Sequence, residues 1–352
     1  MKDNSAFPLG LIEGFYGRQW SWHERRSIAP FLSEFGYQSY IYAPKGDPWL
    51  RSGWREPATE AHLVELQNHK AACHQAGLQW GLGFSPLGFD KESDDQLKLL
   101  AKLAEIDSLA PDVLWLLFDD MRGDDPLLAA KQLELIHLIC SNISAKSFAF
   151  CPTYYSFDPL LEEVFGAMPK SYWHDLGQGL PDEVAVLWTG DKVISPDYNS
   201  AGLQRITKLI GRKPLLWDNY PVNDGRITSN FLHLNAFDRP AEIAEFSAGL
   251  FANPANQHYL SRLPLSTLQA SLAEASDRDM LRKQSFKLFS DMTDLLERDW
   301  PLFQQVGRVE LEERNVIETL IAEYQECENP AAKEVVAWLR GNYKFDPACL
   351  TD

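Results

Sequence analysis

The sequence lacks the patterns of membrane and secreted proteins. No apolar run reaches the length of a transmembrane helix, and residues 1–10 contain no hydrophobic segment of the signal-peptide type. The cysteines form no CxxC pair and are widely spaced, at Cys73, Cys140, Cys151, Cys327 and Cys349. That spacing favours free thiols in a reducing compartment. We therefore expect a cytoplasmic protein that has no membrane partner.

Positive charge is also scarce. The chain has 33 Lys and Arg against 50 Asp and Glu, for a formal net charge of -17. This balance argues against nucleic acid as a partner and disfavours polyanionic substrates. Glycine-rich phosphate loops, His/Cys clusters with metal-ligand spacing and nucleophilic serine elbows are missing too. We expect no cofactor and no metal.

Apolar runs and helical stretches alternate along the first three quarters of the chain. The runs recur about 30–40 residues apart, which suits a barrel of eight βα units. They are Leu9–Gly17, Ser39–Lys45, Gln79–Pro86, Val113–Asp120, Ser147–Tyr155, Val184–Gly190, Lys213–Asn219 and Gly249–Asn253. The pattern predicts an α/β fold, with a (β/α)8 TIM barrel over residues 1–264.

The remaining residues, 265–352, follow a different pattern. Ser266–Trp300 and Val309–Tyr343 are rich in Glu, Lys, Leu and Ala and have amphipathic periodicity, with no strand between them. We expect a C-terminal helical extension of two long helices. It packs on the barrel or on a second chain, which would make a homo-oligomer.

The pair Asp119-Asp120 ends the apolar run Val113–Phe118. Buried carboxylates carry a large desolvation penalty, so these two are poor core residues. Both reach one cleft only if Asp120 lies beyond the end of the strand. Adjacent acids repel, so one can stay protonated near neutral pH while the other is ionised. Taken alone, the pair fits an Asp-Asp turn that caps the next helix equally well.

Polar and aromatic residues gather where the predicted strands end. In a parallel barrel these ends form one face, which carries the chemistry. Carboxylates, amides, a lysine, phenols and indoles suit acid–base chemistry on a polyhydroxylated, partly apolar ligand, which describes a sugar. The segments are Gly14-Phe15-Tyr16-Gly17, Tyr42-Ala43-Pro44-Lys45, Phe118-Asp119-Asp120, Cys151-Pro152-Thr153-Tyr154-Tyr155, Leu187-Trp188-Thr189-Gly190, Trp217-Asp218-Asn219 with Asn223-Asp224, and Asn253-Pro254-Ala255-Asn256.

Several of these segments together resemble glycoside hydrolase family 84, which contains the O-GlcNAcases and related bacterial β-N-acetylglucosaminidases. The matching segments run in order through the barrel, and no motif matches beyond about residue 265. They are Gly10–Trp20 (GLIEGFYGRQW), Tyr42–Lys45 (YAPK), Trp54–Pro57 (WREP), Leu117–Asp120 (LFDD), Cys151–Tyr155 (CPTYY), Trp188–Gly190 (WTG), Trp217–Asn219 (WDN) with Asn223-Asp224, and Asn253-Pro254.

The resemblance implies a retaining exo-β-N-acetylglucosaminidase in which the 2-acetamido oxygen of the substrate attacks the anomeric carbon and forms an oxazoline. Asp119 would then bind the acetamido N–H, and Asp120 would protonate the leaving oxygen and later deprotonate water. Tyr155 and Asn219 would lie at the acetamido group. The resemblance further implies that the methyl group of the acetamido substituent is enclosed by Cys151, Thr189 and Trp217. It also implies that the sugar hydroxyls bind Lys45, Asp224, Asn253 and the Gly14 carbonyl.

Other interpretations stay open. Lys45 also fits a surface lysine, Asn219 and Asp224 fit turn residues, and Tyr154 competes with Tyr155 because strand alternation lets only one of them face the cleft. The alternative function is a catalytically silent GlcNAc-binding protein on the same barrel. A metal-dependent hydrolase would need a histidine at a strand end, and His174 lies on a connection. The substrate is expected to be a β-GlcNAc-bearing glycoside or glycoprotein, with its aglycone undefined.

Overall fold

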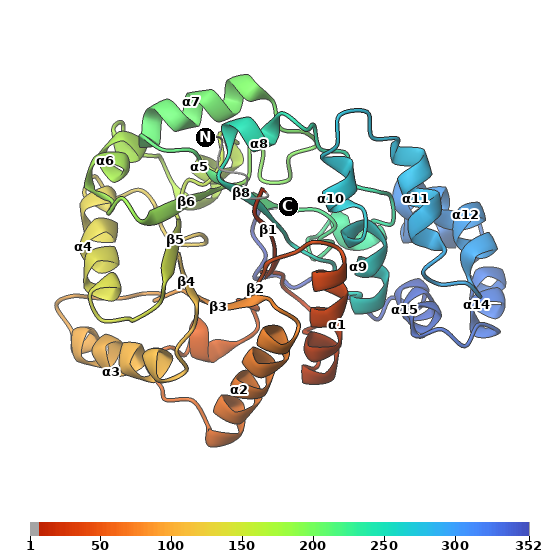
Figure 1. Cartoon of the computed structure of the whole chain (residues 1–352), viewed down its shortest axis with the longest axis horizontal. Coiled ribbons are helices and arrows are strands. Elements are labelled where there is room, and N and C mark those ends of the chain that lie inside the picture. The colour runs from red at the N-terminus through yellow and green to blue at the C-terminus, as the bar shows by residue number, and fades with distance from the viewer. Residues whose placement is uncertain (1–6, 352) are drawn as a thin grey trace.

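Eight parallel strands close into a barrel at the centre of the computed structural model, which describes residues 7–351 (Figure 1). Each strand pairs with the next along the chain, and β8 closes the barrel on β1, with Leu9 opposite Leu250. The predicted (β/α)8 barrel is confirmed. The strands are β1 (Leu9–Glu13), β2 (Ser39–Tyr42), β3 (Gln79–Phe84), β4 (Val113–Leu117), β5 (Ser147–Cys151), β6 (Val184–Trp188), β7 (Leu215–Asp218) and β8 (Gly249–Ala252).

Aromatic side chains from different strands of the barrel pack against one another. The ring centroid of Trp115 lies 5.8 Å from that of Trp217 and 4.7 Å from that of Phe251. Two glycines make room for these rings: a Cβ at Gly10 would lie 2.1 Å from the Phe251 ring, and one at Gly14 would lie 2.3 Å from Trp217. The barrel is therefore a packed core, and a ligand can enter only at its ends.

Helices cover the outside of the barrel (Figure 1). The first begins at a capping box, in which the Ser21 side chain accepts from Glu24 N and the Glu24 side chain accepts from Ser21 N. The outer helices are α1 (Trp22–Glu34), α2 (Glu60–Gln75), α3 (Asp95–Ser108), α4 (Leu128–Cys140), α5 (Leu160–Phe165), α6 (Tyr172–Gly179), α7 (Ser200–Ile210) and α8 (Ile243–Phe246), with the 3₁₀ turns η1 (Pro48–Leu50) and η2 (Thr228–Asn230) in loops.

The C-terminal extension is helical, but the two predicted long helices are wrong. Local stop signals divide each of them: Asp277 caps a new helix within the first, and in the second Asn315 has φ +56° and Asn329 caps another helix with Pro330 at its first position. The observed helices are α9 (His258–Leu265), α10 (Leu268–Ser271), α11 (Arg278–Phe286), α12 (Thr293–Pro301), the π-helical turn η3 (Leu302–Val306), α13 (Arg308–Glu313), α14 (Ile317–Gln325) and α15 (Pro330–Leu339).

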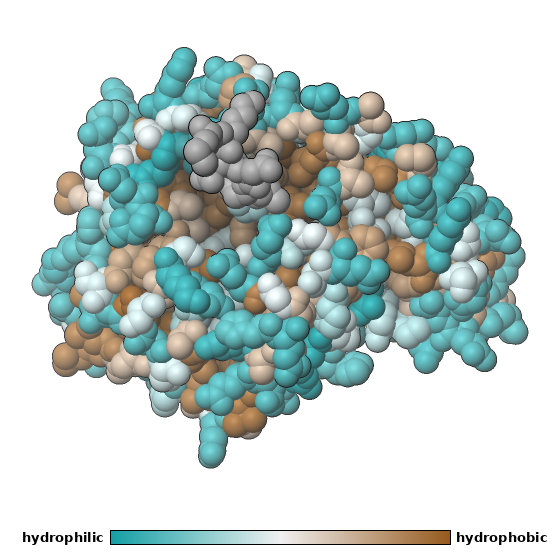
Figure 2. Space-filling view, in the orientation of Figure 1, coloured by the Kyte–Doolittle hydropathy of each residue, from teal (hydrophilic) through white to brown (hydrophobic). Residues whose placement is uncertain are grey.

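These helices, α9 included through Leu260 and Leu263, build a second hydrophobic core beside the barrel core, to which the connection between β7 and β8 also contributes Leu232 and Leu234. The boundary predicted at residue 264 stays a prediction, and α9 runs across it. The face seen in Figure 2 is mostly hydrophilic, in keeping with the acidic composition, and an apolar patch lies over α3. In the part of the chain that the structure describes, no helix has the length and apolarity needed to cross a membrane.

The segment that follows α15 returns to the barrel. The Arg18 guanidinium lies 5.7 Å from the centroid of the Tyr343 ring, and that of Arg226 lies 5.5 Å from the Phe345 ring. Further along, Tyr155 Oη donates to Thr351 Oγ1 at 3.5 Å. The C-terminal helices therefore deliver residues 344–351, which we call the C-terminal segment, to the open end of the barrel.

Candidate active site at the barrel mouth

A pocket lies at the carboxyl ends of the strands, and all eleven predicted site residues line it. Residues at or after the ends of seven of the eight described strands line the pocket, and none of the lining residues comes from β3 or the loop after it. The predicted residues are Gly14 after β1, Lys45 after β2, Asp119 and Asp120 after β4, Cys151 and Tyr155 at the end of β5, Thr189 after β6, Trp217, Asn219 and Asp224 at and beyond the end of β7, and Asn253 after β8. Six further residues complete the lining: Tyr16, Val193, Ile194, Val222, Cys349 and Thr351.

Both carboxylates of the acidic pair reach the pocket because the chain turns after β4. The strand ends at Leu117, and Asp120 has φ +60°, in the left-handed region that Asp tolerates better than most residues. The side chains are 10% and 6% exposed for Asp119 and Asp120. The expectation that Asp120 lies beyond the strand end is confirmed.

Lys45 joins the two acids. Its Nζ donates to Asp119 Oδ2 and, at 3.0 Å, to Asp120 Oδ2. The side chain is only 6% exposed, so Lys45 is no surface lysine. Burial opposes its charge, but Asp119 and Asp120 outweigh burial and hold the pKa of the Lys45 ammonium well above its usual range. A buried cation thus balances part of the negative charge of the pair.

Two unpredicted residues, Tyr16 and Arg51, also contact Asp120. Tyr16 Oη donates to Asp120 Oδ2 at 2.5 Å, and Arg51 Nη2 donates to the same oxygen at 3.1 Å. Tyr16 lies inside the EGFYG part of the Gly10–Trp20 segment that resembles the family, so the sequence contained a signal that could have identified it as a site residue. Arg51 carries no such signal, because nothing in a single sequence separates it from a surface arginine.

The pKa of Asp120 does not follow from repulsion between the adjacent acids alone. Burial raises the pKa of this carboxyl, but Lys45, the Tyr16 hydroxyl and Arg51 outweigh burial and bring the pKa below its usual range. The two cations reach Asp120 from another strand's loop, so only the fold brings them into the electrostatics of the site.

The opposite side of the pocket contains a hydrogen-bond network of amide, indole and backbone groups together with one carboxyl group, that of Asp224. Asn219 Oδ1 accepts from Trp217 Nε1 and from Asn253 Nδ2, each at 3.0 Å. Asn253 Oδ1 accepts from Gly14 N at 3.1 Å, which connects β8 to β1. Asp224 Oδ2 accepts from the Tyr16 backbone N–H at 2.6 Å. The loops after β7, β8 and β1 are therefore held in one arrangement.

Tyr155, Cys151 and Thr189 form the wall after β5 and β6. Burial raises the pKa of the Tyr155 phenol and of the Cys151 thiol well above their usual ranges, so both groups stay neutral. Thr189 Oγ1 donates to Lys192 O at 2.8 Å, so its hydroxyl hydrogen is already in use. The prediction that Tyr155 rather than Tyr154 faces the cleft is confirmed, since Tyr154 Oη instead donates to Gly166 O at 2.6 Å.

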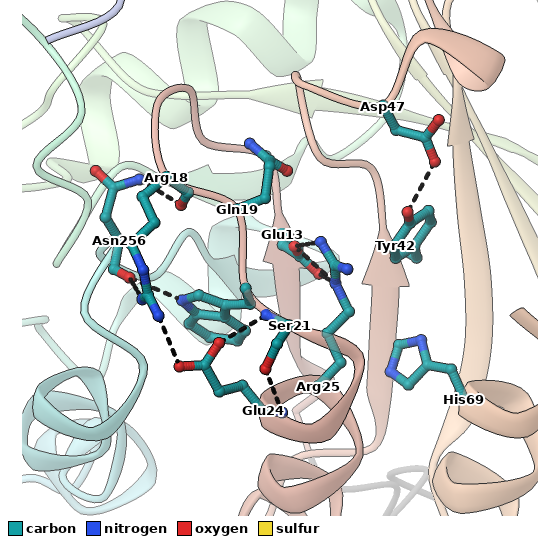
Figure 3. Close-up of polar contacts among 12 residues, drawn as sticks. Glu13, Arg18, Gln19, Ser21, Glu24, Arg25, Tyr42, Asp47, His69 and Asn256 are labelled. Carbon is teal, nitrogen blue, oxygen red and sulfur yellow. Dashed lines mark hydrogen bonds and ion pairs between the residues drawn. The ribbon is translucent and has the colours of Figure 1, made fainter. Parts of the chain in front are cut away.

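The loop between β1 and α1, which carries Tyr16, is fixed at both ends (Figure 3). Arg25 Nη2 on α1 donates to Glu13 Oε1 at the end of β1, at 2.6 Å. Asn256 Nδ2 donates to the backbone oxygens of Tyr16 (2.7 Å) and Arg18 (3.0 Å). These buried contacts hold the loop rigidly enough to position a side chain for chemistry.

Histidines take no part in the pocket lining. His174 lies on α6 with its side chain 67% exposed. Within residues 7–351, no group of three or more His, Cys, Asp or Glu side chains could hold a metal ion. Trp188 is buried against Phe157 and Trp173 and is therefore a core residue.

Comparisons with known proteins show which family this chain resembles. A family model described as β-N-acetylglucosaminidase matches residues 9–295. The proteins called protein O-GlcNAcase from Rattus norvegicus and Mus musculus are each 27% identical to this chain over 277 residues. Each match covers 74% of this chain and 29% of the relative, so the chain spans about three-tenths of the length of these curated relatives.

Solved structures resemble the whole chain. An O-GlcNAc hydrolase of Thermobaculum terrenum has 26% identity and a TM-score of 0.75, and the match covers 94% of this chain and 80% of that one. The structure of CpGH84B, at 21% identity and a TM-score of 0.74, covers 95% of this chain and 66% of that one and supports the fold alone.

Proposed function

The chain belongs to glycoside hydrolase family 84, the β-N-acetylglucosaminidase family, and from this premise we propose that it removes terminal β-linked N-acetylglucosamine with retention of configuration. The proposed reaction is substrate-assisted: the acetamido oxygen of the sugar, rather than an enzyme carboxylate, attacks the anomeric carbon. We further propose that its substrates are of the O-GlcNAcase type, that the protein is cytoplasmic and that it assembles through its C-terminal helices.

The observation that carries the proposal is the surroundings of Asp119. Its Oδ2 accepts from Lys45, while its Oδ1 is buried with no hydrogen-bond partner among the described residues. A buried carboxylate oxygen without a donor is costly, so the site is built to receive one. The N–H of a substrate acetamido group supplies that donor. Held this way, the acetamido oxygen turns toward the anomeric carbon, and Asp119 stabilises the positive charge that develops on the forming oxazoline.

Asp120 transfers the protons. In the first step the acetamido oxygen forms a bond to the anomeric carbon, the bond from that carbon to the leaving oxygen breaks, and the proton of Asp120 passes to that oxygen. In the second step Asp120 takes a proton from water, whose oxygen attacks the anomeric carbon and reopens the oxazoline. Two inversions give net retention. Asp120 must therefore carry a proton at the start and be ionised in between.

The neutral residues shape the sugar site in this proposal. Tyr155 stays protonated and can donate to the acetamido oxygen, and Asn219 lies beside the same group. Cys151, Thr189 and Trp217 enclose the acetamido methyl group. The sugar hydroxyls contact Lys45, Asp224, Asn253 and the Gly14 carbonyl.

The test is an assay of aryl β-GlcNAc and β-GalNAc glycosides beside a GlcNAc-modified peptide. We expect hydrolysis of the GlcNAc substrates with a β-configured first product. Binding of GlcNAc without turnover would favour the catalytically silent sugar-binding protein instead. Turnover of the aryl glycoside but not of the glycopeptide would keep the activity and refute the protein substrate.

A further inference from the structure

Arg51 lies at the acid–base carboxylate although its loop begins at a different strand. Arg51 Nη2 donates to Asp120 Oδ2 (3.1 Å) and to Tyr16 Oη (2.8 Å), and Tyr16 Oη donates to the same Asp120 oxygen (2.5 Å). These three groups form a closed triangle of hydrogen bonds. The side chains of Arg51 and Asp120 are only 16% and 6% exposed, so solvent screens their attraction weakly.

The fold holds Arg51 in this place. The turn η1 just before it is capped by Asp47, whose Oδ1 accepts from Trp49 N at 3.0 Å. Tyr42 Oη at the end of β2 donates to Asp47 Oδ2 at 2.7 Å (Figure 3). The guanidinium of Arg51 lies 5.3 Å from the centroid of the Tyr16 ring, within cation–π distance. Arg51 is thus built into the mouth of the barrel.

Several titratable groups surround Asp120. Two are cations, Lys45 and Arg51, and Lys45 also binds Asp119. Arg51 contacts Asp120 and Tyr16. Burial raises the pKa of Asp120, and Lys45, Tyr16 and Arg51 lower it. The acid Asp119 is its neighbour in the chain. Tyr155 and Cys151 also face Asp120, which helps to raise their pKa values.

We propose that Arg51 is a positioning residue that favours the ionised form of Asp120 and so sets the pH at which Asp120 changes from proton donor to proton acceptor. The inference rests on the proposed function, in which Asp120 gives up a proton in the first step and takes one from water in the second. By stabilising the carboxylate, Arg51 strengthens Asp120 as a donor toward the leaving oxygen. The same contact orients the carboxylate for the incoming water.

The test is the pH profile of kcat/KM on a glycoside whose leaving group needs protonation. Arg51→Gln removes a positive charge, so the pKa of Asp120 rises and its protonated form persists to higher pH. The limb of the profile that descends on the basic side should therefore move to higher pH by about one unit. Arg51→Lys keeps the charge and loses the second hydrogen bond, so its limb should stay near that of the wild type while kcat falls.

Arg55→Gln is the matched control. It removes an arginine from the same loop, but Arg55 binds Asp95, with Nη2 2.5 Å from Oδ2, so the limb should not move. Thermal unfolding checks that each variant folds. If Arg51→Gln does not fold, Arg51→Met serves as the neutral variant.

If the basic limb of the kcat/KM profile does not move in an active Arg51→Gln or Arg51→Met variant, the inference is wrong. It is also wrong if Arg51→Lys shifts the limb as far as the neutral variant does. A wild-type protein without glycosidase activity would instead overturn the proposed function.

Discussion

The pocket has two halves that are held together by different forces. The half from β1, β2 and β4, the charged half, contains Tyr16, Lys45, Arg51, Asp119 and Asp120. The half from β5 to β8, the neutral half, contains Cys151, Tyr155, Thr189, Trp217, Asn219 and Asn253. In the charged half each buried ion has a partner of opposite sign. In the neutral half, amides, a phenol and a thiol hold their shape over a wide pH range.

This difference suggests a division of work. Charged groups in a poorly solvated site respond strongly to a change of one neighbour, because the Coulomb energy is large there. A network of neutral hydrogen bonds responds mainly through geometry. We therefore expect substitutions in the charged half to change rates and pH profiles, and substitutions near the neutral half to change which sugar is accepted.

The largest effect should come from Asp120→Asn, which keeps the size of the side chain and removes its acid–base chemistry. We expect kcat/KM to fall about 10²–10⁴-fold for poor leaving groups and much less for activated phenols, whose departure needs no proton. The measurement is a series of aryl β-GlcNAc substrates that differ in leaving-group pKa. A loss that is uniform across the series would remove the acid role from Asp120.

Asp119→Ala should have the next largest effect. The oxazoline charge must be stabilised whatever group departs, so kcat should fall for every leaving group, by about 10²–10³-fold. A trifluoroacetamido substrate, with its poorer nucleophile, should also slow the wild type. If fluorination has no effect on the rate, the acetamido group is not the nucleophile and the charged half works by another mechanism.

Asp224 connects the halves, since it follows β7 and accepts from the Tyr16 backbone N–H. If its carboxylate binds a sugar hydroxyl, a wrongly placed hydroxyl costs about 1–3 kcal/mol, and wild type should prefer β-GlcNAc to β-GalNAc at least about tenfold. Asp224→Ala should lower kcat/KM and shrink this preference with little change in the pH limbs. An unchanged preference at near-normal activity would place Asp224 outside the sugar site.

The smallest effect should come from the C-terminal segment, which reaches the neutral half at Tyr155. The contact to Thr351 is long, at 3.5 Å, so displacing it should cost no more than about 1 kcal/mol, or about fivefold in KM. We expect truncation after Tyr343 to lower KM by up to that factor and to leave kcat unchanged. Thr351→Val is the milder variant. A rise in KM would show instead that the segment helps to bind the substrate.

The barrel and most of its site could be predicted from the sequence. A strand buried on both faces is a continuous apolar run, and a switch to polar residues marks its end. The run at Val113 followed by Asp119-Asp120 has this form, and so do the ends at Lys45 and Asn253. Once the strands are parallel, their ends must share one face, so the local pattern was enough to bring these side chains together.

The helical extension shows where local patterns fail. Amphipathic periodicity over Ser266–Trp300 predicted one helix, but Asp277 begins a new one by accepting from two backbone N–H groups. A hydrophobic stripe specifies which face is buried and does not specify whether the helix continues. Capping and turn residues inside the stripe decide that, and their weight depends on the packing around them.

The sequence by itself determined the alternation of strands and helices, the strand ends at which polar side chains emerge and the adjacency of Asp119 and Asp120, because each depends on residues close together in the chain. Only the tertiary structure decided that Arg51 and Tyr16 meet at Asp120, that Lys45 lies between the two acids and that Thr351 reaches Tyr155. These contacts join residues far apart in the chain, and electrostatic energies depend on distances in space. The protonation of Asp120 is therefore a property of the fold.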